Sequence, residues 1–301
     1  MPHCARALAS PSLRSVSLAL VLLATAVLAA PTSADTNLGT VGGVRYMHDQ
    51  DDLVGGFPNI GAPVADCPGG TQVVGGGADA VEGGTDGRLL ASYPIDDSDD
   101  RFTPDDAWRA YTFNTSGADA DAEAYAMCLE NSRSRYVRDE VTFQGPGSEA
   151  HSVRCSSGRV AAGGAHVSGA SGSGWISTSI GIDGNDSDQA PDDGWRVKAY
   201  GSQSQQTLSA WAICLRGLRV GYQRAAFTSN VNAAFAFEIP CGRGHLLGGG
   251  VAVAGDLLQR TIEAMLPIDG GDKGKVPDDG MHFNGAAPAP VAANAMVSCL
   301  K

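Results

Sequence analysis

The chain is poor in lysine and in the motifs that mark common catalytic sites. Lysine occurs four times in 301 residues. There is neither a G-x-S-x-G nucleophile elbow nor an H-E-x-x-H helix. No segment carries a helical apolar stripe over three turns, and the histidines after residue 34 share no position in the repeat described below. These absences argue against an enzyme, and they leave a hydrolase with an unorthodox site as a remote alternative.

Basic residues are also scarce relative to acids. The sequence has 21 Lys plus Arg against 33 Asp plus Glu. Removing Arg6 and Arg14 with the N-terminal segment leaves 19 against 33, a net charge of −14. Nucleic acids and anionic lipid surfaces are bound through a basic footprint. The composition therefore predicts neither kind of partner.

The N-terminal segment has the pattern of an export signal. Residues 1–15 carry two arginines and no acid, residues 16–30 are apolar, and Thr32-Ser33-Ala34 offers small residues before a cut. An uncleaved anchor is the alternative, but about 15 apolar residues are fewer than the ~20 of a membrane span. We expect a signal peptide over 1–34 and a secreted, extracellular protein over 35–301 without membrane insertion.

Three matched blocks divide the exported part into repeats of about 44–131, 135–217 and 220–301. The first block is C-x-x-G-x-x-x-x-G-G, which aligns without a gap from Cys67, Cys155 and Cys241. The second is I-D-x-x-D-x-x-x-x-P-D-D, and the third ends in Cys128, Cys214 or Cys299 before a leucine. A tyrosine opens each unit at Tyr46, Tyr136 and Tyr222. Because the joints are short, we expect one domain rather than three linked ones.

Within a unit the apolar pattern alternates with the period of a strand. Trp108 to Phe113, Trp195 to Tyr200, Thr71 to Gly77 and Leu89 to Ile95 each predict a strand, as does each cysteine-ending block. Forty glycines indicate many tight turns. The prediction is an all-β fold of three homologous antiparallel β units around a pseudo-threefold axis.

The order of these marks resembles the vitelline membrane outer layer family, a β-prism with three Greek-key sheets. The resemblance is carried by Cys155 to Gly164, Asp192-Asp193 and Cys214, and it implies a disulfide-stapled, β-prism-like fold. The triplicated blocks also resemble uncharacterised secreted repeat proteins of high-GC Gram-positive bacteria, which implies export and offers no activity.

Six cysteines in an exported chain indicate three disulfides. The repeat leaves two symmetric pairings. Within units the bonds are Cys67–Cys128, Cys155–Cys214 and Cys241–Cys299; across units they are Cys128–Cys155, Cys214–Cys241 and Cys299–Cys67. We favour the first, because each cysteine-ending strand can lie beside the glycine strand of its own unit.

The aspartates of the second block are the candidate metal ligands, and calcium is the one possible cofactor. Carboxylates at matched positions suit calcium, a hard cation that prefers oxygen ligands. The alternative is that they cap turns by accepting backbone N–H groups. The candidates are Asp96, Asp99, Asp105, Asp106, Asp183, Asp186, Asp192, Asp193, Asp269, Asp272, Asp278 and Asp279.

Trp108 and Trp195 follow the aspartate blocks, with Met281 at the third position. They are either core residues or a stacking platform for sugar rings. The function hypothesis is a non-enzymatic binding protein for an extracellular glycan or cell-envelope polymer. The alternative is a purely structural surface protein without a small ligand.

Overall fold

The computed structural model describes residues 35–53, 59–80, 87–96, 103–114, 119–168, 173–184, 188, 190–203, 205–229, 233–254, 261–270, 276–287 and 291–301. Residues 33–301 form one compact unit. The segment predicted as an export signal lies outside the described residues. No helix in the described part of the chain has the length and apolarity to cross a bilayer.

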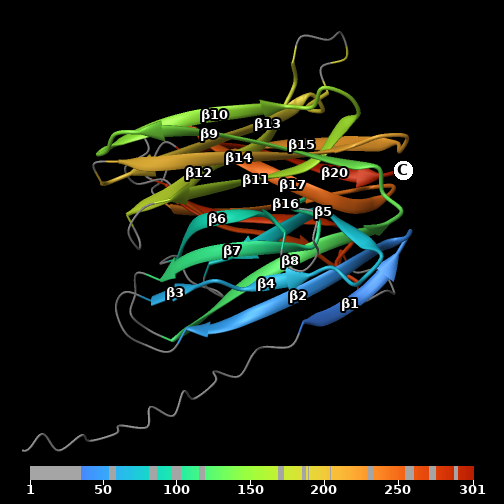
Figure 1. Cartoon of the computed structure of the whole chain (residues 1–301). Helices are drawn as coiled ribbons and strands as arrows, with labels where there is room; N and C mark the ends of the chain where they lie inside the picture. The colour runs from blue at the N-terminus through green and yellow to red at the C-terminus, as the bar shows by residue number, and fades with distance from the viewer. Residues whose placement is uncertain are drawn as a thin grey trace, which may run out of the picture. The chain divides into compact units, whose positions relative to one another are not determined.

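In the described part of the chain, twenty strands form three antiparallel sheets, so the predicted all-β class is confirmed (Figure 1). In order, sheet A is β1 (Thr36–Val41), β2 (Val44–Leu53), β8 (Ala120–Glu130), β5 (Thr71–Asp79), β18 (Thr261–Ile268), β19 (Gly280–Ala287) and β16 (Ala233–Pro240). Sheet B is β3 (Asn59–Gly61), β7 (Ala107–Asn114), β6 (Gly87–Ile95), β11 (Arg159–Ser168), β14 (Gln206–Leu215) and β9 (Ser134–Phe143), with β4 (Val64–Asp66) also on β7. Sheet C is β10 (Gly147–Arg154), β13 (Gly194–Gly201), β12 (Gly174–Ile182), β17 (His245–Ala254), β20 (Val291–Leu300) and β15 (Val220–Ser229).

Each repeat is divided between two sheets rather than forming one sheet of its own. The first repeat gives β2, β5 and β8 to sheet A and β3, β4, β6 and β7 to sheet B. The second gives β9, β11 and β14 to sheet B and β10, β12 and β13 to sheet C. The third gives β15, β17 and β20 to sheet C and β16, β18 and β19 to sheet A. Every sheet therefore contains strands from two repeats. The first repeat shares sheet B with the second, the second shares sheet C with the third, and the third shares sheet A with the first.

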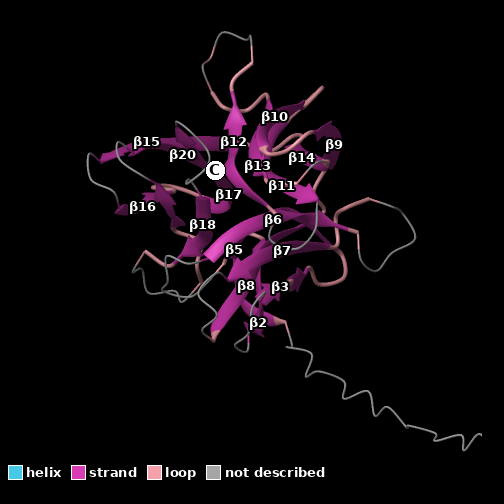
Figure 2. Cartoon of the chain, turned by 90° about the vertical axis from the view of Figure 1, so that its left-hand side faces the viewer, coloured by secondary structure: helices cyan, strands magenta, loops and turns pink. Residues whose placement is uncertain are grey.

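The pairings between two repeats are made by equivalent strands each time. Strand β6 pairs with β11, β12 pairs with β17, and β18 pairs with β5, each through two residue pairs. In the end-on view of Figure 2, β11, β17 and β5 lie inside the outer strands of their sheets. One continuous core cluster draws on all three repeats. The three units are therefore one folding body.

The three disulfides follow the pairing within units. Cys67 bonds to Cys128, Cys155 to Cys214 and Cys241 to Cys299, with Cα–Cα separations of 5.6, 5.7 and 5.8 Å. Each bond ties the loop before a glycine strand to the end of its neighbour in the same sheet. The favoured pairing is confirmed.

The glycine strands approach one another too closely for larger residues. A Cβ atom on Gly75 would lie 1.8 Å from the Leu247 carbonyl oxygen and 3.1 Å from Ala162 Cβ. A Cβ on Gly248 would lie 2.7 Å from the same alanine. Residues of β5, β11 and β17 thus meet at the centre, one from each repeat.

The gap-free alignment of the glycines is wrong by one residue in the first repeat. Gly76, Gly163 and Gly249 are the structural equivalents, because a Cβ on each would strike Trp108, Trp195 or Met281. The first repeat has one extra residue between Gly70 and the β-bulge of its glycine strand. All three glycine strands carry this bulge at the equivalent place, so the extra residue of the first repeat lies ahead of the bulge.

We predict that Gly75→Ala destabilises the protein by at least about 2 kcal/mol, because the new methyl group would displace backbone at the centre. Gly69→Ala is the matched control, since a Cβ there meets nothing within 4 Å. Urea unfolding of the two variants measures the difference. Equal midpoints would contradict the close packing of the three glycine strands.

The tyrosine that opens each repeat bonds to the preceding repeat. Tyr136 donates its hydroxyl to the Val73 carbonyl at 2.6 Å, and Tyr222 donates to Val160 at 2.7 Å. Tyr46 completes the ring by donating to Leu246 of the third repeat at 2.8 Å. Burial, followed by nearby Asp105, Asp192 or Asp278, raises the pKa of each phenol. The ring of bonds depends on neutral tyrosines.

The raised pKa values predict alkaline instability. Above pH about 10 the three tyrosines ionise in the unfolded chain but stay protonated when folded. The free energy of unfolding should then fall by up to about 4 kcal/mol per pH unit for three such groups. Tyr222→Phe should reduce this slope by about a third and cost roughly 1 kcal/mol at pH 7. Urea unfolding as a function of pH tests both; an unchanged slope would count against the assignment.

Candidate functional site

The paired aspartates hold the ends of the strands through their backbone. In the second repeat, Asp192 O accepts from Val160 N at 2.9 Å and Asp193 O accepts from Cys155 N at 2.8 Å. Asp193 N donates to Ile182 O at 3.1 Å. The same bonds recur at Asp105 and Asp106 in the first repeat and at Asp278 and Asp279 in the third. This geometry is that of a structural turn.

The first aspartate of each pair is buried and meets a side-chain donor. Asp105, Asp192 and Asp278 are 6%, 5% and 5% exposed. Gln72 Nε2 donates to Asp105 Oδ2 at 2.5 Å, Arg159 Nε lies 3.1 Å from Asp192 Oδ2, and His245 Nδ1 lies 2.7 Å from Asp278 Oδ2. The side chain that contacts the buried carboxylate is thus glutamine in the first repeat, arginine in the second and histidine in the third.

The second aspartate closes the loop before it. Asp193 Oδ2 accepts from Gly184 N at 2.5 Å, and Asp279 Oδ2 accepts from Gly270 N at 2.8 Å. Asp99, Asp186 and Asp272 lie outside the described residues. Among the residues that are described, no three His, Cys, Asp or Glu side chains are grouped to hold a metal ion. Calcium at these loops stays a prediction.

Trp108 and Trp195 are core residues, 1% and 0% exposed. Trp108 Nε1 donates to Ser92 Oγ at 2.8 Å, and Trp195 Nε1 donates to Ser179 Oγ at 2.9 Å. Neither ring face is open to a ligand, so the sugar platform proposed for them has no place there.

A pair of methionines replaces this bonded pair in the third repeat. Met281 takes the tryptophan position, and Met265 takes the position of the serine acceptor. Both methionines are buried. Losing donor and acceptor together leaves no buried polar group unpaired.

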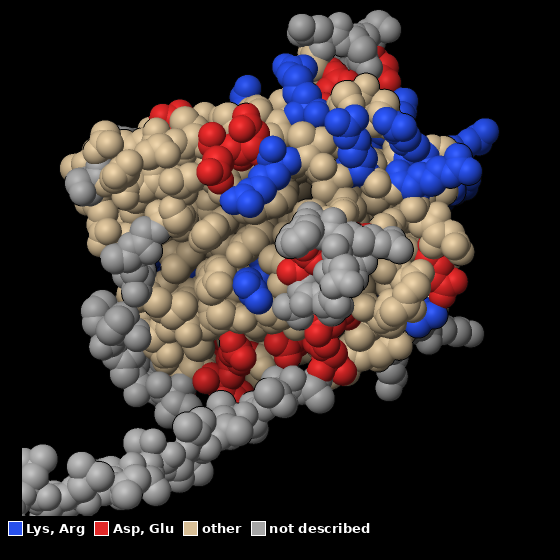
Figure 3. All heavy atoms as spheres, in the orientation of Figure 1, with Lys and Arg blue, Asp and Glu red and all other residues tan. Residues whose placement is uncertain are grey.

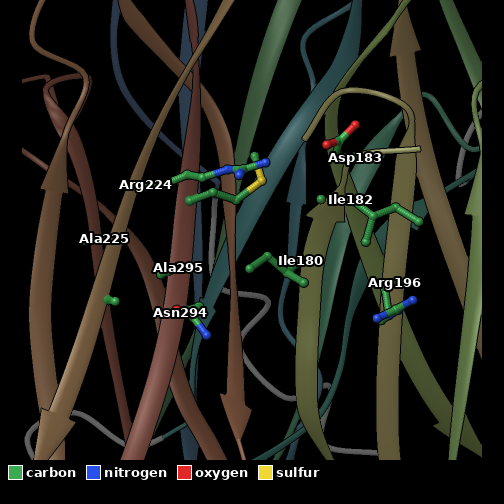
Figure 4. A pocket seen from close by; sticks show the side chains of 11 residues that line it. Ile180, Ile182, Asp183, Arg196, Arg224, Ala225, Asn294 and Ala295 are labelled. Atoms are coloured by element: carbon green, nitrogen blue, oxygen red, sulfur yellow. The ribbon is translucent and has the colours of Figure 1, made fainter. Parts of the chain in front are cut away.

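An open groove crosses sheet C where the second and third repeats join. It has a volume of about 570 Å³, and its polar lining includes Asp183 at the end of β12, Arg196 on β13 and Arg224 on β15. Figure 4 shows Ile180 and Ile182 on β12, with Arg196 to one side and Arg224 extending from β15 on the other. Met296 of β20 completes the floor. We name this set groove C.

Groove B is the equivalent on sheet B, where the first and second repeats join. Its volume is about 500 Å³. Its lining includes Tyr93, Asp96, Arg109, Arg138 and Trp211. In this order, these residues occupy the same repeat positions as five lining residues of groove C, namely Ile180, Asp183, Arg196, Arg224 and Met296. One carboxylate and two guanidinium groups thus recur in both grooves of an acidic protein.

Aromatic rings make groove B different from groove C. Tyr93 stacks on Trp211 with ring centroids 4.6 Å apart and on His166 at 5.3 Å. The Arg138 guanidinium lies 5.1 Å from the Trp211 ring centre, which is within cation–π range. Burial, and then the charge of Arg138, lowers the pKa of His166. Arg138 also pairs with Glu140 at 3.0 Å. The groove therefore holds two arginines beside carboxylates, over an aromatic floor.

Sheet A carries histidines at the two arginine positions. His48 and His282 stand where Arg138 and Arg109 stand in groove B. His48 Nε2 lies 3.5 Å from Glu123 Oε1, and Tyr125 donates to Glu123 Oε2 at 2.6 Å. Although burial would raise the pKa of Glu123, these two partners lower it. This third position therefore holds histidines beside an acid, where the other two hold two arginines.

Sequence reasoning missed these grooves, although a signal was present. A basic residue follows Trp108, Trp195 and Met281, and another stands two places after each opening tyrosine. The two positions come together only because strands of different repeats share a sheet.

A comparison with protein-family models and with curated protein sequences finds no match for this chain.

We expect the aspartate loops to act as turns, because Asp193 Oδ2 and Asp279 Oδ2 accept hydrogen bonds from the backbone of their own loops. Asp193→Ala removes one such acceptor and should lower the melting temperature equally in EDTA and in millimolar calcium, by an amount matching about 1 kcal/mol. Thermal unfolding measures this. A rise with calcium that EDTA reverses, and that Asp193→Ala abolishes, would instead support the metal interpretation.

Proposed function

We propose that the protein is a secreted, non-enzymatic binding protein for an anionic glycan or cell-envelope polymer, held in grooves B and C. The observation that carries the proposal is the recurrence of one carboxylate and two arginines in two grooves at matched repeat positions. Three disulfides fit an oxidising, extracellular compartment.

The groove chemistry suits a polyhydroxylated chain that carries carboxylates or phosphates. Arginine binds such groups through paired N–H donors. Asp96 and Asp183 offer acceptors for sugar hydroxyls. The half-buried Tyr93 presents an aromatic ring beside them, and the apolar face of a sugar ring packs on such rings.

Two grooves on one body also favour a polymer over a free monosaccharide. Linked sites raise apparent affinity when both engage the same chain. We also propose that the three sheets form a pseudo-threefold prism like that of the vitelline membrane outer layer family. In such a prism the two grooves lie on different sheets. Calcium assistance through the aspartate loops is not required by this binding mode.

The test is affinity electrophoresis or calorimetry with a polyuronate, a phosphate-bearing wall polymer and a neutral glucan of similar length. We expect one of the anionic polymers to bind and the neutral glucan not to bind. Arg138→Ala with Arg224→Ala should weaken binding at least about tenfold, as loss of charge-assisted hydrogen bonds implies.

Arg45→Ala is the matched control, because this arginine pairs with Glu130 at 2.6 Å and lines neither groove. Its affinity should equal that of the parent protein. Equal affinity in the groove variant and the control would refute the proposed site. Binding to no polymer of the panel would favour a purely structural role.

A further inference from the structure

Basic side chains gather at one end of the molecule, beyond the grooves. Figure 3 shows Lys and Arg concentrated at the upper right of the visible face. We define the basic end as six exposed residues from the start of β9, the β14–β15 turn, the loop before β17 and the C-terminus. They are Arg133, Arg135, Arg216, Arg219, Arg243 and Lys301.

Hydrogen bonds and a shared hollow connect these segments. Arg216 N donates to Arg133 O at 3.3 Å, and Lys301 N donates to Arg219 O at 2.9 Å. The Arg135 and Arg216 side chains donate to the hydroxyls of Ser156 and Ser157 in one loop. Arg243 and Lys301 line one surface hollow. The six charges therefore form a continuous surface.

This surface keeps its positive charge. Nearby Arg159 is paired with Asp188 and Asp192. Within the described part of the chain, none of the ion pairs formed includes a residue of the basic end. Six of the 19 basic residues after position 34 stand here, in a protein of net charge −14.

An exposed leucine lies in the middle of the basic end. Leu218 is 37% exposed and sits between Arg216 and Arg219 in the β14–β15 turn, next to Gly217 with φ +76°. Among the described residues, the other exposed large apolar side chain is Ile60. An apolar tip flanked by arginines is the arrangement that binds headgroups and enters the acyl boundary together.

We propose that the basic end docks the protein on an anionic lipid surface, with Leu218 entering the headgroup region. The sequence expectation against anionic surfaces rested on net charge. Charges more than about 10 Å away are screened at physiological salt, so the local surface decides. A soluble phosphate polymer would satisfy the arginines but would offer nothing to the exposed leucine, which is why the lipid surface is favoured.

The experiment is co-sedimentation with phosphatidylcholine vesicles that contain or lack phosphatidylglycerol. We expect binding to the anionic vesicles alone, and its loss at high salt. Arg216→Glu with Arg219→Glu should weaken it at least about thirtyfold, roughly fivefold or more per basic residue removed. Arg243→Glu with Lys301→Glu provides a second variant at a separate place in the surface. Arg45→Glu with Lys198→Glu changes the net charge equally at residues outside the basic end and outside both grooves, and it should bind as the parent does.

A soluble polyphosphate distinguishes the two sources of phosphate. Leu218→Ser should weaken vesicle binding several-fold and leave polyphosphate binding unchanged. An equal loss of vesicle binding in the Arg45 and Lys198 control, or no vesicle binding by the parent protein, overturns the proposal. Polyphosphate competing fully while Leu218→Ser has no effect would assign the surface to a soluble polyanion instead. Because glycan binding is measured through grooves B and C, failure here leaves the proposed function standing.

Discussion

The pairing of each repeat's strands with those of the next repeat is the constraint on which the whole structure depends. Strands β6, β12 and β18 each pair with a strand of another repeat. In a repeat by itself, two strands would each lose a neighbour, such as β5 and β6 in the first repeat. This closure hides strand edges that would otherwise be exposed. It also explains why the three glycine strands must meet at the centre.

Equivalent positions in the repeats tolerate change when both partners of an interaction change together. The tryptophan–serine pair of two repeats becomes a methionine pair in the third. The donors facing Asp105, Asp192 and Asp278 are glutamine, arginine and histidine. What is kept in each case is a filled volume and a satisfied polar group. Surface positions are free of this requirement, which lets the three sheets differ in charge.

The same closure places the grooves at the junctions between repeats. In grooves B and C one arginine comes from the strand after an aspartate loop and the other from the opening strand of the next repeat. Neither groove exists within a single unit. The acidic net charge therefore coexists with two grooves that each hold two arginines and with a basic end, because each is a local feature of the folded surface.

The sequence by itself determined the all-β class, the three repeats and the favoured disulfides, because strand period and cysteine spacing are local properties of the chain. Tertiary structure alone decided that β6 joins β11, that Arg109 faces the same groove as Arg138, and that Trp108 is buried beneath Gly76. It also showed the one-residue shift at Gly75, since only the strand pairing shows that the first repeat has an extra residue ahead of its bulge. Exchange of strands between repeats is a long-range choice, and no spacing within one repeat encodes it.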